Sequence, residues 1–182
     1  GNAVLIRKIY FPREIFPLTS VLTKLVELGL NLTILCGIMA WYGISPGAQS
    51  AWLPLLVILT ILVSLVISLI GAAVNVFFRD AAQAIPVLLS LLMYTSPIIY
   101  PLRLVQEKLL ADRAAGEYSE LLYALYLANP LAGIIDSAQR TLLMNQPPDL
   151  ETMLPGVALT LVLLPLSYAF FKRAEASFSD YI

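Results

Sequence analysis

The residues best suited to binding a partner lie near the start of the chain, in the segment RKIYFPREIFP at 7–17. Charged and aromatic side chains alternate there directly before a hydrophobic stretch. A proline at position 12 suits the first turn of a short helix, where its missing N–H costs least, and Pro17 ends that helix. Basic residues ahead of a crossing are typical of the cytoplasmic side. We therefore expect 7–16 to form a cytoplasmic docking helix with these candidate contacts: Arg7, Lys8, Tyr10, Phe11, Pro12, Arg13 and Glu14.

Catalytic and metal chemistry lacks its usual residues. The chain has no histidine and one cysteine, Cys36, so zinc sites and Cys–His nucleophilic pairs are excluded. Its carboxylates are scattered rather than paired, and no GxxxxGKS/T phosphate-binding loop occurs. The net charge is −1 and no basic patch is present, which argues against nucleic acid. We predict a protein that is not an enzyme, with no catalytic residue, no metal and no cofactor bound by this chain.

The turn VNVFFRDAAQAIP at 74–86 carries two adjacent charges, Arg79 and Asp80. They could contact a cytoplasmic partner or a neighbouring loop. A structural interpretation is as good, because a short cytoplasmic turn needs a positive charge and Asp is a good N-cap for the helix that follows.

The tract YTSPIIYP at 94–101 contains Tyr94, Ser96 and Tyr100 around a proline. Proline frees backbone carbonyls, which lipid tolerates only where the region is packed in protein or lines a cavity. The tyrosines could therefore present rings and hydroxyls to a passing sugar. An interfacial aromatic belt explains them equally well, and it is the favoured explanation for Tyr42.

Composition and spacing predict an all-α polytopic membrane protein. The chain is 59% hydrophobic and 13% charged, with a mean hydropathy of +0.84, whereas soluble domains carry roughly 25% charged residues. We expect four transmembrane helices, one for each long apolar stretch. With four crossings the basic residues concentrate on the side of both chain ends, which is therefore predicted to be cytoplasmic. The predicted crossings are 18–42, 53–75, 84–101 and 153–171.

The stretch 102–152 is predicted to lie outside the membrane on the opposite face. Residues 101–116 have the pattern of a short amphipathic helix, and two further helical pieces, 118–128 and 131–144, are separated by Asn129-Pro130. The apolar part of 118–144 is only about fifteen residues long. That length suits a re-entrant or interfacial element better than a crossing. The sequence shows no repeat or linker, so 1–182 is predicted to be one domain.

Several of these motifs together resemble a known family. RKIYFPREIFPLTSV, NVFFRDAAQAIP, YTSPIIYP, the Asn129-Pro130 pair and the C-terminal FKRAEASFSDYI are similar to the permease subunit of ABC-2-type exporters of O-antigen, teichoic acid and capsule polysaccharides. Family permeases have six crossings preceded by an amphipathic interfacial helix. This chain resembles the part from the first cytoplasmic loop onward, so the interfacial helix and first two crossings are expected to be absent.

The resemblance implies a role for each segment. It makes 7–16 a coupling helix for a separate ATPase subunit, which would hold the ATP and Mg²⁺. It makes 102–128 a periplasmic gate, and a homodimer whose pathway 18–42 and 84–101 line is expected in the inner membrane. The implied cargo is a lipid-linked glycan, with Tyr42, Tyr94, Ser96 and Tyr100 as candidate contacts.

Other functional interpretations remain open beside the polysaccharide exporter. The nearest is an ABC-2 permease for a smaller cargo, such as a lipo-oligosaccharide or a drug. Another is a structural membrane subunit that does not transport. A membrane glycosyltransferase is the least favoured, since no clustered acids face a cavity.

Overall fold

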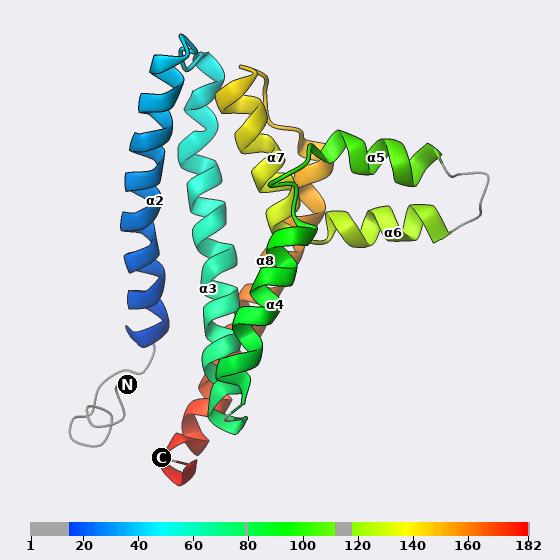
Figure 1. Ribbon diagram of the computed structural model, residues 1–182. Coiled ribbons are helices and arrows are strands. Elements are labelled where there is room, and N and C mark those ends of the chain that lie inside the picture. The colour runs from blue at the N-terminus through cyan, green and yellow to red at the C-terminus, as the bar shows by residue number, and fades with distance from the viewer. Residues whose placement is uncertain (1–14, 79, 112–117, 182) are drawn as a thin grey trace.

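The computed structural model describes residues 15–78, 80–111 and 118–181, and within them the protein is built from helices without strands (Figure 1). This confirms the all-α polytopic prediction. In chain order the elements are α2 (Ile15–Trp41), the short 3₁₀ helix η1 (Ala48–Trp52), α3 (Leu53–Phe77), α4 (Ala81–Thr95), α5 (Leu102–Ala111), α6 (Tyr118–Leu127), α7 (Pro130–Leu143) and α8 (Leu150–Tyr181).

Within the described residues, three helical stretches are long and apolar enough to cross a membrane: α2, η1 with α3, and Leu150–Glu175 of α8. Their ranges contain the predicted crossings 53–75 and 153–171 and all but the last residue of 18–42. The helix α3 has 25 residues without a charge, so at 1.5 Å per residue it is about 37 Å long, more than a bilayer core of about 30 Å. A proline at its start removes an N–H that would have no helical partner.

The fourth predicted crossing, 84–101, is helical over a shorter range. α4 has 15 residues, about 22 Å, and ends at Thr95. Ser96 is extended (φ −91°, ψ 149°) because the ring of Pro97 disfavours helical geometry in the residue before it. The tract 96–101 is therefore a bend that leads into α5, and the crossing at 84–101 stays a prediction.

The helices α6 and α7 form a pair bent by 77° at the break between them. Together they pass the length and apolarity test of a span, as a broken span or a re-entrant loop would. The predicted pieces 118–128 and 131–144 are confirmed as helices, as is α5 within 101–116. Asn129 caps α7 by accepting the Leu131 N–H at 3.1 Å, and Pro130 takes the first helical position.

The core lies between α3 and α8, with α7 inserted at one end. One buried cluster joins Leu69 and Ala73 of α3 to Phe171 and Ala174 of α8. The other joins α3, α7 and α8 through Leu56, Val63, Ile134 and Met153. We call α3, α7 and α8 the frame. Figure 1 shows α8 running along α3 to the lower end of the molecule, with α7 beside the upper part of both.

Two glycines let α7 and α8 touch backbone to backbone. A Cβ added at Gly133 would lie 2.5 Å from the Met153 Cα, and one added at Gly156 would lie 2.6 Å from the Pro130 Cα. Small residues at a helix crossing allow this close approach in membranes, where packing replaces the hydrophobic effect as the source of helix association. The position of α7 on α8 is therefore tightly fixed.

The helices α5 and α6 pack on each other and project sideways from the bundle (Figure 1). We call this pair the arm. Leucines on its described surface are exposed, namely Leu104, Leu121, Leu122 and Leu125. An ion pair on α5 joins Arg103 to Glu107 at 2.8 Å. The arm begins and ends near the upper end of α4.

Candidate functional site

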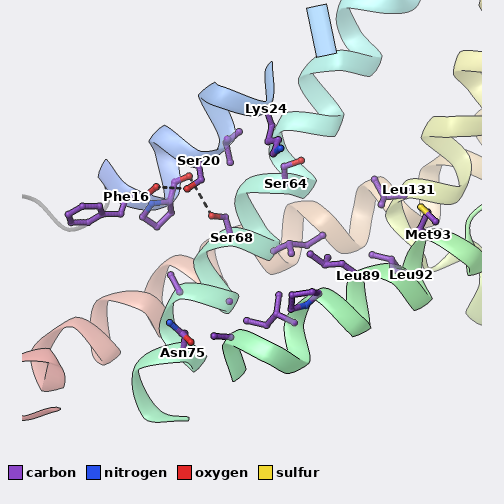
Figure 2. A pocket seen from close by; sticks show the side chains of 18 of the residues that line it. Phe16, Ser20, Lys24, Ser64, Ser68, Asn75, Leu89, Leu92, Met93 and Leu131 are labelled. Carbon is purple, nitrogen blue, oxygen red and sulfur yellow. Dashed lines mark hydrogen bonds between the residues drawn. The ribbon is translucent and has the colours of Figure 1, made fainter. Parts of the chain in front are cut away.

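A groove of about 670 Å³ lies between α2, α3 and α4. Figure 2 shows side chains from the three helices converging on it. Its wall is mostly apolar, with Leu89, Leu92 and Met93 of α4 on one side. The helices that the sequence predicted to line a pathway, within 18–42 and 84–101, are thus the two flanks of this groove.

Small and polar residues follow one face of α3 along the groove. Ser64, Ser68, Gly71 and Asn75 are spaced three or four residues apart, which is the spacing of one helical face. Ser68 donates to the Pro17 carbonyl of α2 at 3.5 Å, a long bond that links the two helices. Ser64 and Asn75 have no hydrogen-bond partner among the described residues, so their polar groups are available to a ligand.

From α2 the groove receives Lys24, whose ammonium pairs with Glu27 at 2.7 Å. The two residues are three apart, which places them on one face of α2. Their side chains are 73% and 53% exposed, so surrounding headgroups or water compete with the pair. Lys24 can therefore turn toward an anionic group in the groove at small cost.

A second cavity of about 340 Å³ lies between α2, α3 and α7. Its two polar side chains are already bonded: Thr60 donates to the Leu56 carbonyl and Gln139 to the Pro97 carbonyl. The cavity therefore offers a ligand mainly apolar contact. The groove beside α4, with unpartnered polar groups, is the better candidate for a functional site.

At the upper end of the groove the structure brings Tyr94, Ser96 and Tyr100 together. Tyr94 is 60% exposed, and its backbone carbonyl accepts the Tyr100 hydroxyl at 3.1 Å. Ser96 lines the groove but is only 1% exposed. Its hydroxyl donates to the Leu92 carbonyl at 2.7 Å and accepts from the Asn129 amide at 2.9 Å. A glycan contact by these three residues stays a prediction.

Tyr42 is not gathered with the other predicted contacts. It is 75% exposed and directly follows α2, whose end lies beside the start of α3 (Figure 1). The end of α4 lies on the other side of α3, next to the start of α7. Its role as a glycan contact also stays a prediction.

The predicted docking residues lie before the described part of the chain. The expected helix end at Pro17 is wrong, because α2 begins at Ile15 and continues through Pro17, which falls in its first turn, where a proline is tolerated. Arg7, Lys8, Tyr10, Phe11, Pro12, Arg13 and Glu14 lie outside the described residues, as does Arg79. Asp80 does stand at the N-cap position of α4, but its side chain makes no capping hydrogen bond. Among the described residues, no three His, Cys, Asp or Glu side chains gather in a way that could hold a metal.

Sequence reasoning missed the polar face of α3 and the amides of α7. Ser64 and Ser68 stand in an unbroken apolar run, where a serine usually bonds its own helix. The Asn-Pro pair was noted as a hinge, and asparagine before an N1 proline is also a cap signal that could have been read. No local signal pointed to Gln139, whose partner Pro97 is 42 residues away.

Comparison with known proteins bears on this geometry. Residues 2–111 match the sequence model of the family described as ABC-2 type transporter. The chain belongs to the ABC-2 type transporter family. The matched range includes α2, α3 and α4, and therefore all three walls of the groove. The family and the long apolar helices make this ABC-2 chain a multi-pass membrane protein.

Relatives of this ABC-2 chain extend the match to α8. The O-antigen export system permease protein RfbA of Myxococcus xanthus is 29% identical over 178 residues, 98% of this chain. Two proteins of the same name from Klebsiella pneumoniae are each 28% identical over 185 residues, 99% of this chain. The chain spans 64% of the length of each of these curated relatives.

Proposed function

We propose that this chain belongs to the permease subunit of an ATP-driven ABC exporter that moves a lipid-linked polysaccharide across the cytoplasmic membrane. The observation that carries the proposal is the alignment of nearly the whole chain with proteins named O-antigen export system permease. The groove supports it, because it combines an apolar wall with hydroxyl, amide and ammonium groups. An amphiphile with a long hydrocarbon chain and a polar, anionic head matches that combination.

In this proposal the energy for transport comes from a separate ATPase subunit that binds ATP and Mg²⁺. The segment 7–16, whose last two residues are the start of α2, is the coupling element that docks it, and Arg79 with Asp80 forms a second cytoplasmic contact. Both ends of the chain face the cytoplasm. Two permease copies enclose the pathway, with α2 and α4 contributing to its lining and the arm covering its exit.

A smaller amphiphilic cargo is the second candidate. It is favoured by one feature of the groove: among the described residues that line it, Phe16 is the one aromatic side chain. Sugar rings stack on aromatic faces, so a groove of this composition suits the lipid portion of a cargo better than a bare glycan. A polysaccharide exporter requires additional aromatic lining, which Tyr94 and Tyr100 would supply above the groove.

The coupling role is tested by reversing charge in the full-length permease assembled with its ATPase. The Arg13→Glu and Glu14→Arg variants are expected to lower glycan export and the ATPase activity that cargo stimulates. The reason is that each reversed charge would be repelled by the charge on the ATPase that the native residue attracts. An Arg173→Glu variant serves as the control, since it reverses the charge of an exposed basic residue elsewhere in the chain. Normal export by both docking variants, in an intact complex, would reject the coupling role.

A further inference from the structure

The arm leaves and rejoins the bundle at almost the same point. Ser96 precedes the arm and Asn129 follows it, 33 residues later. Their side chains meet in a hydrogen bond in which the Asn129 Nδ2 donates to the Ser96 Oγ at 2.9 Å. The base of the arm is therefore closed by one polar contact between the end of α4 and the start of α7.

Both side chains are oriented for this contact by local hydrogen bonds. The Asn129 Oδ1 accepts the Leu131 N–H, which leaves its NH₂ group facing Ser96. The Ser96 hydroxyl gives its proton to the Leu92 carbonyl, so toward Asn129 it acts as an acceptor. A partly buried bond of this kind has little competition from water, and leaving either partner unpaired is costly.

A second amide of α7 holds the next residue of the bend. The Gln139 Nε2 donates to the Pro97 carbonyl at 3.0 Å, and Pro97 is itself fully buried. The carbonyl needs such a partner because the bend leaves it outside the hydrogen-bonding pattern of α4. Two consecutive residues of the bend are thus bound by side chains from one helix.

The helix that supplies these amides is itself fixed. Gly133 of α7 contacts the backbone of α8 at Met153, and Gly156 of α8 contacts Pro130. A slide of α7 along α8 would drive backbone atoms into one another. The end of α4, from which the arm begins, can therefore move away from the frame only if these amide bonds break.

We propose that Asn129 is a positioning residue that clamps the arm and the upper end of α4 to the frame. The clamp consists of the Asn129–Ser96 bond, supported by the Gln139–Pro97 bond. It holds the end of α4, where the arm begins, against the start of α7, where the arm ends. Its consequence for export rests on the proposed function, whereas the clamp itself is a property of the fold.

The test measures the position of the arm relative to the frame in the intact permease in lipid nanodiscs. Spin labels are placed at Gln106→Cys on α5 and Leu161→Cys on α8, both exposed, in a Cys36→Ser background. Pulsed electron paramagnetic resonance then gives the distribution of distances. In the protein with an intact clamp, we expect a single narrow distribution of the distance between the two labels.

Two variants open the clamp from opposite sides. Asn129→Ser keeps a good N-cap but is too short to reach Ser96, and Ser96→Ala removes the acceptor. Each is expected to raise the population outside the main distance peak about fivefold, the equivalent of about 1 kcal/mol for one hydrogen bond. The double variant is expected to do no more than either single one, since both remove the same bond.

Ser90→Ala is the matched control, because Ser90 is on the same helix and bonds only the Pro86 carbonyl of its own turn among the described residues. Unchanged distance distributions in Asn129→Ser and Ser96→Ala, or equal broadening in Ser90→Ala, would overturn the proposal. If Ser96→Ala does not fold, Asn129→Ser and Gln139→Met decide by the same criterion.

A second readout separates positioning from simple stability. With the ATPase assembled, the clamp variants are expected to hydrolyse ATP at the normal rate but to export less glycan per ATP. An equal export-to-hydrolysis ratio in variants and wild type would reject the positioning role. If the wild-type complex itself exports no glycan, the proposed function fails, and the distance measurements still decide on the clamp.

Discussion

The two sides of α3 are packed in opposite ways. Toward α7 and α8 it forms the frame, where large apolar residues are buried and glycines bring backbones into contact. Toward α2 and α4 it borders the groove, where serines and an asparagine face an open volume of about 670 Å³. The frame therefore holds these helices in fixed positions, whereas the groove side of α3 provides space for a cargo or for movement.

The largest effect is expected from filling the contact inside the frame. Gly133→Ala would place a methyl group 2.5 Å from the Met153 Cα, so backbone atoms must separate. We expect a loss of about 1–3 kcal/mol of unfolding free energy, the usual range for overpacking, measured by unfolding in detergent.

Gly37→Ala is the matched control for this substitution. It lies in α2, and no atom lies within 4 Å of its added Cβ. We expect it to be neutral or to stabilise by up to about 1 kcal/mol, through helix propensity. Equal destabilisation by the two substitutions would show that the α7–α8 contact is not a tight one.

The smallest effect is expected on the groove side, at the pair between Lys24 and Glu27. Both side chains are more than half exposed, so a double-mutant cycle with Lys24→Gln and Glu27→Gln should give a coupling energy below about 1 kcal/mol. The reason is that headgroups and water replace each partner. A coupling energy above about 2 kcal/mol would place the pair in the apolar part of the bilayer and contradict its exposure to headgroups or water.

Much of the fold could be predicted from local sequence. A run of 25 uncharged residues leaves α3 little alternative to crossing a bilayer, and the Asn-Pro pair marked the bend between α6 and α7. Within the predicted crossing 84–101, Pro97 carried the signal for the end of α4: the residue before a proline leaves the helix, so the helix boundary falls at Thr95.

The site was less accessible to sequence reasoning because it depends on tertiary contacts. Whether Ser64 bonds its own helix or faces a groove is decided by where α2 and α4 pack. The partner of Asn129 is 33 residues away, and a short-range pattern carries no information about it. The aromatic residues drew attention to Tyr94 and Tyr100, while the amides that hold their segment in place went unnoticed.

The most direct test of the account is export by two leucine variants of the full-length permease assembled with its ATPase. Ser64→Leu fills the groove with a larger side chain, whereas Ser90→Leu makes the same change on the exposed surface of α4, outside the groove. Both proteins should fold with normal yield, since leucine is tolerated in membrane helices. The account predicts that Ser64→Leu lowers export about tenfold or more, the equivalent of about 1.4 kcal/mol, while Ser90→Leu exports normally. Normal export by a folded Ser64→Leu protein would contradict the claim that the groove beside α4 is part of the transport site.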